Sequence, residues 1–189
     1  MMGLHHEQCH RRSIRLQGYD YAQVGAYFVT ICTYQKECVF GQVVGGEMRV
    51  NGGGEIVLSA WNSLPDRFPS IVLDSFIIMP NHVHGIVMLG AINDVGAGQA
   101  LPEKRGAASS APTMNKITTF GDAVRAFKSI SAIQVSRLLG RKGLPLWQRN
   151  YYEHIIRNEQ SLDSIRQYIV NNPLRWAGDG ENPVNAPKT

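Results

Sequence analysis

Two apolar segments separated by only two residues constrain the fold of this 189-residue chain more than any other feature. Residues 70–79 read SIVLDSFIIM and residues 82–89 read HVHGIVML, with Pro80 and Asn81 between them. β-Branched and aromatic residues favour strands, whereas a Pro-Asn pair favours a turn. We therefore expect two strands joined by a tight turn, in a chain long enough to bury a hydrophobic core.

The remaining segments alternate between strand and helix patterns. We expect a strand at 25–34, a hairpin at 40–51 around Gly45-Gly46, helices at 55–64, 114–140 and 161–172, and an extended segment at 147–157. The long helix is expected to break near Gly121, and the last helix to start at Ser161 as N-cap and end at Pro173. This order predicts an α+β sandwich with helices on one face of a mainly antiparallel sheet.

The domain boundaries follow from composition. Residues 90–113 contain 14 Gly, Ala, Ser or Pro among 24 positions, which predicts a flexible loop. Residues 1–10 and 177–189 are expected to be loose ends. One domain at 11–176 is therefore expected.

Composition also excludes several classes of protein. Hydrophobic residues make up 43% of the chain, which is too many for a wholly disordered protein. No apolar run approaches the ~20 residues that span a bilayer, so we do not expect an integral membrane protein. The three cysteines follow no CxxC spacing. We expect them to be reduced thiols in a cytoplasmic protein.

Basic residues concentrate in one part of the sequence. The whole chain carries a net charge of +4, whereas residues 125–175 alone contain nine basic and three acidic side chains, a net charge of +6. A second basic cluster lies near the start, at Arg11, Arg12 and Arg15. Such clusters suit phosphate binding, but a solvated helix face would give the same pattern.

The sharpest chemical feature is His82-Val83-His84. Alternate residues of a strand point to the same face, so the two imidazoles are expected to lie side by side and could chelate one metal ion. A His-x-His sequence also occurs by chance, so the pair alone does not establish a metal site.

A second candidate group lies on the helix expected at 161–172. Tyr168 and Asn172 are four residues apart and so share one face of that helix, beside its apolar stripe. The tyrosine hydroxyl could face a ligand, and the amide oxygen of Asn172 could complete a metal site. A tyrosine at the edge of the core and an asparagine ending a helix would have the same spacing.

Four blocks of this sequence, taken together and in order, resemble a known family. MPNHVHGIV resembles the His-hydrophobic-His motif of single-tyrosine HUH transposases, and QYIVNNP resembles their nucleophile helix. RRSIRLQGYDYAQVGAYFVTICTYQKECVFG and WQRNYYEHIIRN resemble the first strand region and the segment before the tyrosine helix of REP-associated tyrosine transposases. The resemblance covers about residues 11–176, interrupted by the 90–113 loop.

The resemblance implies a ferredoxin-like α+β fold and an enzyme that cuts and rejoins single-stranded DNA. It implies that Tyr168 attacks the DNA and that His82 and His84 hold a divalent metal ion, Mg²⁺ or Mn²⁺. Asn172 stands where relatives often carry Gln as the third ligand. These ligands do not exclude Zn²⁺.

The same resemblance implies a DNA partner with hairpin-forming palindromes. The basic residues expected to contact DNA are Arg11, Arg12, Arg15, Arg125, Lys128 and Arg149. Trp147, Tyr151 and Tyr152 could stack on bases, and for Trp147 a place in the core is equally compatible. His154 is a candidate neighbour of the reaction centre or a structural histidine.

Two other function classes stay open at this stage. A non-catalytic module that binds single-stranded nucleic acid could have the same fold and basic residues, but it would not require His82, His84 and Tyr168 together. A metal-binding protein without nuclease activity would leave the excess of basic residues unexplained. The sequence does not distinguish a monomer from a homodimer.

Overall fold

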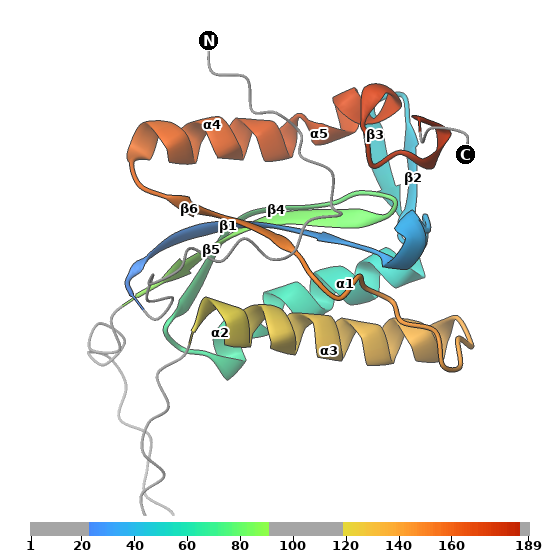
Figure 1. Ribbon diagram of the computed structural model, residues 1–189, viewed down its shortest axis with the longest axis horizontal. Coiled ribbons are helices and arrows are strands. Elements are labelled where there is room, and N and C mark those ends of the chain that lie inside the picture. Colours follow the sequence, from blue (N-terminus) through green and yellow to red (C-terminus); the bar gives the residue numbers. More distant parts are fainter. Residues whose placement is uncertain (1–22, 91–118, 186–189) are drawn as a thin grey trace, which may run out of the picture.

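The computed structural model describes residues 23–90 and 119–185 (Figure 1). In chain order these contain β1 (Gly25–Cys32), η1 (Tyr34–Lys36), β2 (Gly41–Val44), β3 (Glu47–Val50), α1 (Gly52–Asn62), α2 (Leu64–Arg67), β4 (Ile71–Ile78), β5 (His82–Leu89), α3 (Phe120–Leu138), β6 (Tyr152–Ile156), α4 (Glu159–Val170), α5 (Asn172–Arg175), η3 (Trp176–Gly178) and η4 (Pro183–Asn185). The predicted order of strands and helices is confirmed.

Four strands form the central sheet in the order β4-β5-β1-β6, and every neighbouring pair is antiparallel. Leaving the hairpin aside, the chain runs β1-α1-β4-β5-α3-β6. This is the split βαβ order of a ferredoxin-like fold. The predicted α+β class with a mainly antiparallel sheet is therefore confirmed. The tight turn at Pro80-Asn81 joins β4 to β5, its neighbour in the sheet.

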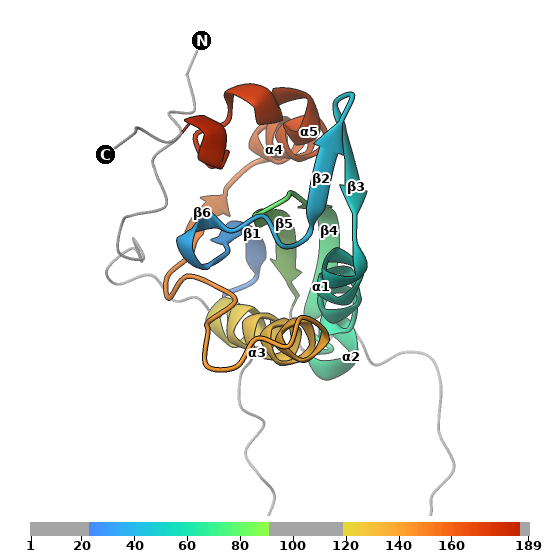
Figure 2. The same ribbon diagram turned by 90° about the vertical axis from the view of Figure 1, so that its right-hand side faces the viewer.

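Helices cover both faces of this sheet, so the expectation of helices on one face only is wrong. Figures 1 and 2 show three layers, with α1, α2 and α3 on one side of the sheet and α4 and α5 on the other. The two hydrophobic clusters agree with this arrangement. One joins Phe127 of α3 and Trp61 of α1 to the sheet, and the other joins Ile165 of α4 to its opposite face.

The alternation of β1 explains how one strand serves both layers. Tyr27, Val29 and Ile31 belong to the cluster under α1 and α3, whereas Phe28 belongs to the cluster under α4. Since side chains alternate along a strand, a strand buried on both faces reads as a continuous apolar run. The runs in β1 and in the second half of β5 are therefore a sequence signal for a sheet that is covered on both sides.

The helix starts differ from the predicted ones in detail. The amide N–H groups of Gly53 and Gly54 donate to Asn51 Oδ1, so α1 begins three residues earlier than expected. Helix α3 begins at Phe120 behind a capping box between Thr119 and Asp122, and it continues through Gly121 without a break.

Helix α4 also starts and ends earlier in the sequence than the helix predicted at 161–172. The N-cap of α4 is Asn158, whose Oδ1 accepts from the amide of Ser161, so Ser161 is not the cap. Helix α4 ends at Val170, and Asn172 is the first residue of the short helix α5.

Residues 177–185 are not a loose end. They form two turns of 3-10 helix, and Asp179, Glu181 and Asn182 are buried. The amide of Asn182 donates to the carbonyl of Asp179, and the Asn182 side chain donates to the carbonyl of Trp176. This C-terminal segment, residues 176–185, therefore belongs to the folded domain.

The loop predicted at 90–113 and the ends 1–10 and 186–189 lie outside the described residues, except for Gly90. Within the described ranges, no helix is long and apolar enough to cross a membrane. Cys38 is an exposed free thiol, as expected.

Candidate active site

The two histidines of β5 face α4 and meet at their ring nitrogens. His82 and His84 are 0% and 3% exposed, and their ring centroids lie 4.6 Å apart. Their Nε2 atoms are 3.1 Å apart. The prediction that the two imidazoles project side by side is confirmed.

Asn81 fixes which nitrogen of His82 carries the proton. Its Nδ2 donates to the carbonyls of Lys36 and Glu181, at 3.0 and 2.7 Å. The amide oxygen therefore faces His82 Nδ1, at 2.9 Å, and can only accept. His82 thus carries its proton on Nδ1, which leaves the lone pair of Nε2 directed at His84.

Thr30 holds the second imidazole from the neighbouring strand. Thr30 is the strand partner of His84, and its Oγ1 lies 2.8 Å from His84 Nδ1. Phe28 stacks on the same ring with centroids 5.6 Å apart. Contacts of this kind at Nδ1 orient histidines that bind metal through Nε2.

Tyr168 and Trp176 approach the pair from the α4 layer. The Tyr168 ring lies 5.2 Å from the His84 ring, and the Trp176 ring lies 6.0 Å from the His82 ring. Asn172 stands midway between them in the sequence and is 1% exposed. Its Oδ1 is buried without a hydrogen-bond partner among the described residues.

These groups fit a divalent metal ion. Two bonds of about 2.1 Å from nitrogen to metal can span the 3.1 Å between the Nε2 atoms. A buried amide oxygen without a partner costs stability, and a cation would satisfy it. The two imidazoles are therefore placed to hold one ion together, and Asn172 as the third ligand stays a prediction.

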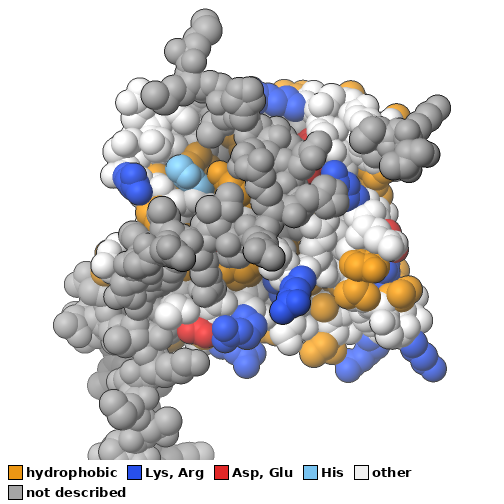
Figure 3. All heavy atoms as spheres, in the orientation of Figure 1, with side chains coloured by type: hydrophobic (Ala, Val, Ile, Leu, Met, Phe, Trp, Pro, Cys, Tyr) orange, Lys and Arg blue, Asp and Glu red, His pale blue; other side chains and the backbone are white. Residues whose placement is uncertain are grey.

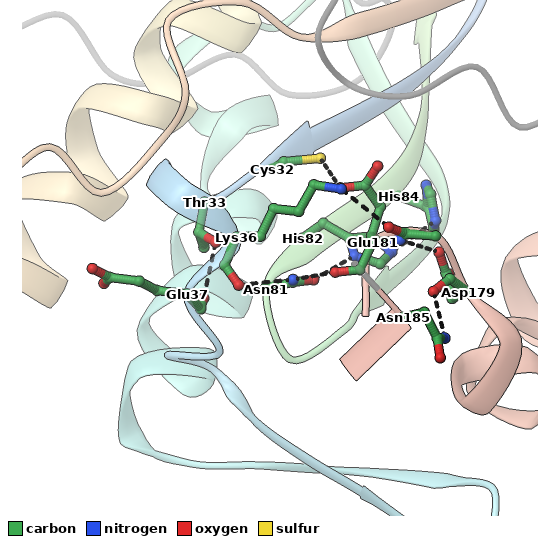
Figure 4. A network of polar contacts seen from close by, with 11 residues as sticks. Cys32, Thr33, Lys36, Glu37, Asn81, His82, His84, Asp179, Glu181 and Asn185 are labelled. Carbon is green, nitrogen blue, oxygen red and sulfur yellow. Dashed lines mark hydrogen bonds and ion pairs between the residues drawn. The ribbon is translucent and has the colours of Figure 1, made fainter. Parts of the chain in front are cut away.

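The C-terminal segment closes one side of the site (Figure 4). The Glu181 carbonyl binds Asn81, and the Glu181 carboxylate lies 3.3 Å from Lys36 Nζ. Cys32 Sγ donates to the same carboxylate at 3.7 Å. Side chains from β1, η1, β5 and the C-terminal segment are thus joined in one buried polar network.

The basic residues expected to bind DNA do not gather around the histidines. Arg125, Lys128 and Arg149 belong to α3 and to the loop that follows it, on the other side of the sheet from α4. Figure 3 shows several Lys and Arg side chains along the surface formed by α3. Their contact with DNA stays a prediction, and Arg11, Arg12 and Arg15 lie outside the described residues.

Lys128 has a structural task. Its Nζ donates to the carbonyls of Gln148 and Arg149, at 2.7 and 2.9 Å, and lies 5.9 Å from the centre of the Tyr151 ring. Burial lowers its pKa to about 8. This lysine therefore holds the segment before β6 against α3.

The aromatic and histidine candidates near β6 divide between core and surface. Trp147 is buried and its Nε1 donates to Ser131 Oγ, so it belongs to the core. Tyr152 is 38% exposed on the edge strand. His154 is exposed on the same strand, and partial burial together with the charge of Arg157 lowers its pKa.

Thr30, Asn81 and Glu181 are the residues of the site that sequence reasoning missed. Asn81 has a local signal, since it directly precedes His82, but the Pro80-Asn81 pair predicts only a turn. Thr30 and Glu181 come next to the histidines only through strand pairing and the path of the C-terminal segment. Nothing in the local sequence marks them.

Comparison with known proteins finds a relative in sequence and solved structures with a similar fold. The chain is 41% identical over 177 residues to a protein of Haemophilus influenzae (strain Rd) described as uncharacterized, covering 94% of this chain and 93% of the relative. No protein-family model matches the sequence. The solved structure of a REP-associated tyrosine transposase bound to a REP hairpin is similar with a TM-score of 0.53 at 17% identity, covering 90% of each chain. The fold implied by the sequence resemblance is therefore confirmed.

Proposed function

Since the chain belongs to one family with the Haemophilus influenzae protein and has the fold of a REP-associated tyrosine transposase, we propose that it is a transposase of this kind. It would cut and rejoin single-stranded DNA at hairpin-forming repeats and would require Mg²⁺ or Mn²⁺. The observation that carries the proposal is the placement of Tyr168 beside His84, whose Nε2 converges with that of His82.

The chemistry of the residues supports this assignment. In the proposed step, Tyr168 Oη forms a bond to phosphorus, and the bond from phosphorus to the 3′ oxygen of the preceding nucleotide breaks. The phenol loses its proton and the leaving 3′ oxygen gains one. The products are a phosphotyrosine at the 5′ end of one strand and a free 3′-hydroxyl on the other.

The reverse reaction joins strands without an external energy source. The phosphotyrosine ester keeps the energy of the broken phosphodiester, so another 3′-hydroxyl can attack it and release Tyr168. An unperturbed phenol loses its proton near pH 10, so the step needs assistance at neutral pH. A bound divalent ion would supply it by polarising the phosphate and offsetting its charge.

The site's residues have separate tasks in this proposal. His82, His84 and Asn172 would bind the ion, while Asn81 keeps His82 in the tautomer that presents Nε2 and Thr30 orients the His84 ring through Nδ1. Phe28 packs edge-on against the Tyr168 ring, with centroids 6.1 Å apart, and so limits where the phenol can point. The hairpin as the substrate comes from the DNA bound by the structural neighbour.

The direct test is formation of a covalent protein–DNA adduct. Single-stranded hairpin oligonucleotides from palindromes of the host genome are incubated with the protein and Mg²⁺ or Mn²⁺, then separated on a denaturing gel. The wild type is expected to form a slowly migrating adduct with the metal ion and to form none when EDTA is present during the reaction. Tyr168→Phe is expected to give none while still binding the oligonucleotide.

The controls distinguish the proposed transposase from the alternative functions. Tyr152→Phe is the matched control, because Tyr152 is exposed on β6 and is expected to leave the adduct unchanged. Binding without any adduct in the wild type would favour the non-catalytic nucleic-acid module. Full adduct formation in EDTA would remove the metal from the proposal.

A further inference from the structure

Glu181 is a buried carboxylate with one unsatisfied oxygen. The residue is 1% exposed, and its Oε1 has no hydrogen-bond partner among the described residues. Its Oε2 lies 3.3 Å from Lys36 Nζ and accepts from Cys32 Sγ at 3.7 Å. Leaving a charged oxygen buried without a partner is costly, so a further group is expected there.

The carboxylate lies on the face of the sheet that carries the histidine pair. Cys32, which donates to it, is the strand partner of His82, and paired residues of antiparallel strands point to the same face of a sheet. Figure 4 draws Glu181 in the same polar network as Lys36, His82 and His84. The backbone of Glu181 is also tied to the site, because its carbonyl accepts from the Asn81 amide that orients His82.

We propose that the Glu181 carboxylate is an outer ligand of the divalent cation at His82 and His84, acting through a bridging water molecule. The inference rests on the cation site of the proposed function and adds a residue to it. Within residues 23–90 and 119–185, no three His, Cys, Asp or Glu side chains lie close enough to hold a metal directly. The carboxylate therefore acts through water.

The charges of the site explain why such a group is needed. Two neutral imidazoles and an amide bring no negative charge to a divalent cation. Glu181 brings one, and Mg²⁺ keeps several of its waters when it binds proteins, which suits a contact through water. Lys36 pairs with the other carboxylate oxygen, and its positive charge would weaken cation binding.

These charges predict changes of opposite sign in cation affinity. Loss of an outer ligand weakens metal binding about 10- to 100-fold. Glu181→Gln keeps the shape of the side chain and is expected to weaken Mn²⁺ binding about 10-fold. Lys36→Met removes a positive charge and is expected to tighten it. Glu47→Gln, an exposed carboxylate on β3, is the matched control and is expected to have no effect.

The experiment is isothermal titration of the metal-free full chain with MnCl₂ and with MgCl₂, without DNA. Circular dichroism checks that each variant is folded. Weaker binding in Glu181→Gln with tighter binding in Lys36→Met supports the proposal. If Glu181→Gln fails to fold, tighter binding in Lys36→Met supports it and unchanged or weaker binding overturns it.

Other outcomes overturn it in distinguishable ways. Unchanged affinity in a folded Glu181→Gln, with binding lost in His82→Ala, overturns the role of Glu181 and leaves the cation site intact. Weaker binding in both Glu181→Gln and Lys36→Met indicates a structural role only. A wild type that binds neither ion overturns this inference together with the cation in the proposed function.

Discussion

Neutral side chains decide how the two imidazoles of this protein are presented. Asn81 holds the proton of His82 on Nδ1, and Thr30 lies against Nδ1 of His84, so both Nε2 atoms converge at 3.1 Å. Neither side chain adds charge. They instead fix the orientation of both rings. An exposed His-x-His pair would lack such contacts, so they distinguish an ordered site from a chance occurrence of two histidines.

Thr30→Val tests this role at a single residue. Valine has the same shape but lacks the hydroxyl that bonds His84 Nδ1, so we expect Mn²⁺ affinity to fall about 10-fold with the fold retained. Thr30→Ser keeps the hydroxyl and is expected to restore most of the affinity. Titration calorimetry measures both. Equal affinity in the valine and serine variants would remove Thr30 from the site.

At the scale of elements, α1 packs closely against β5 at Gly85. A Cβ at Gly85 would lie 2.6 Å from the Trp61 ring and 3.0 Å from Phe76, whose rings stack with centroids 4.4 Å apart. Gly85 follows His84 and faces the opposite layer. The glycine therefore lets the indole pack flat against the strand that carries the histidines.

Gly85→Ala is expected to lower the free energy of unfolding by about 1–3 kcal/mol, because the added methyl group overpacks this contact. Chemical denaturation measures the loss. Gly90→Ala is the matched control directly after the same strand, where the nearest atom to the new Cβ would be 3.7 Å away. A similar stability for both variants would contradict the account of this contact.

A salt bridge ties α4 to the edge of the sheet. Arg166 donates to both carboxylate oxygens of Asp74, at 3.0 and 2.7 Å, two residues before Tyr168. Asp74 lies at an irregularity in the pairing of β4 with β5. The hydrogen bond from Arg166, with smaller help from Ser75, lowers the pKa of Asp74 below its ordinary value of 3.8.

This shift predicts a dependence on pH. A carboxyl group whose pKa is lower in the folded state stabilises the fold above its ordinary pKa and loses that effect as the pH falls through the folded value. Asp74→Asn is thus expected to lower Tm by a few degrees at pH 7 and to differ less from wild type below about pH 4. Thermal melts across this range measure it. A constant difference would contradict the assignment.

At the scale of the molecule, the sheet separates two surfaces. The stretch 125–175 carries a net charge of +6 in sequence, but α3 and α4 place its residues on opposite sides. On the α4 side, Arg166 is paired with Asp74, whereas Arg175 is exposed next to Trp176. A charge run in sequence is therefore not one patch in space.

Much of this fold could be predicted from the sequence, because strand runs, turn residues and helix periodicity are local signals. The second helical layer was not predicted, although the apolar runs of β1 and of the second half of β5 indicate strands buried on both faces. The order in residues 177–185 had no such signal. It depends on contacts of Glu181 with Lys36 and Asn81, which lie about 100 or more positions earlier.

Some features of the candidate site could likewise be predicted from the sequence, and others could not. The convergence of His82 and His84 follows from strand alternation and could be predicted. The approach of Tyr168 came from the family resemblance, because helix spacing alone does not say which face of the sheet α4 covers. Thr30 joins the site only through the pairing of β1 with β5, which no local pattern encodes.

The central claim is that Tyr168 is the residue that becomes joined to DNA. Its most direct test is mass spectrometry of the protein after reaction with a single-stranded hairpin oligonucleotide, nuclease digestion and proteolysis. The account predicts a nucleotide linked through its 5′ phosphate to the peptide that contains Tyr168. A nucleotide on Tyr151 or Tyr152, or an adduct that persists in Tyr168→Phe, would contradict it.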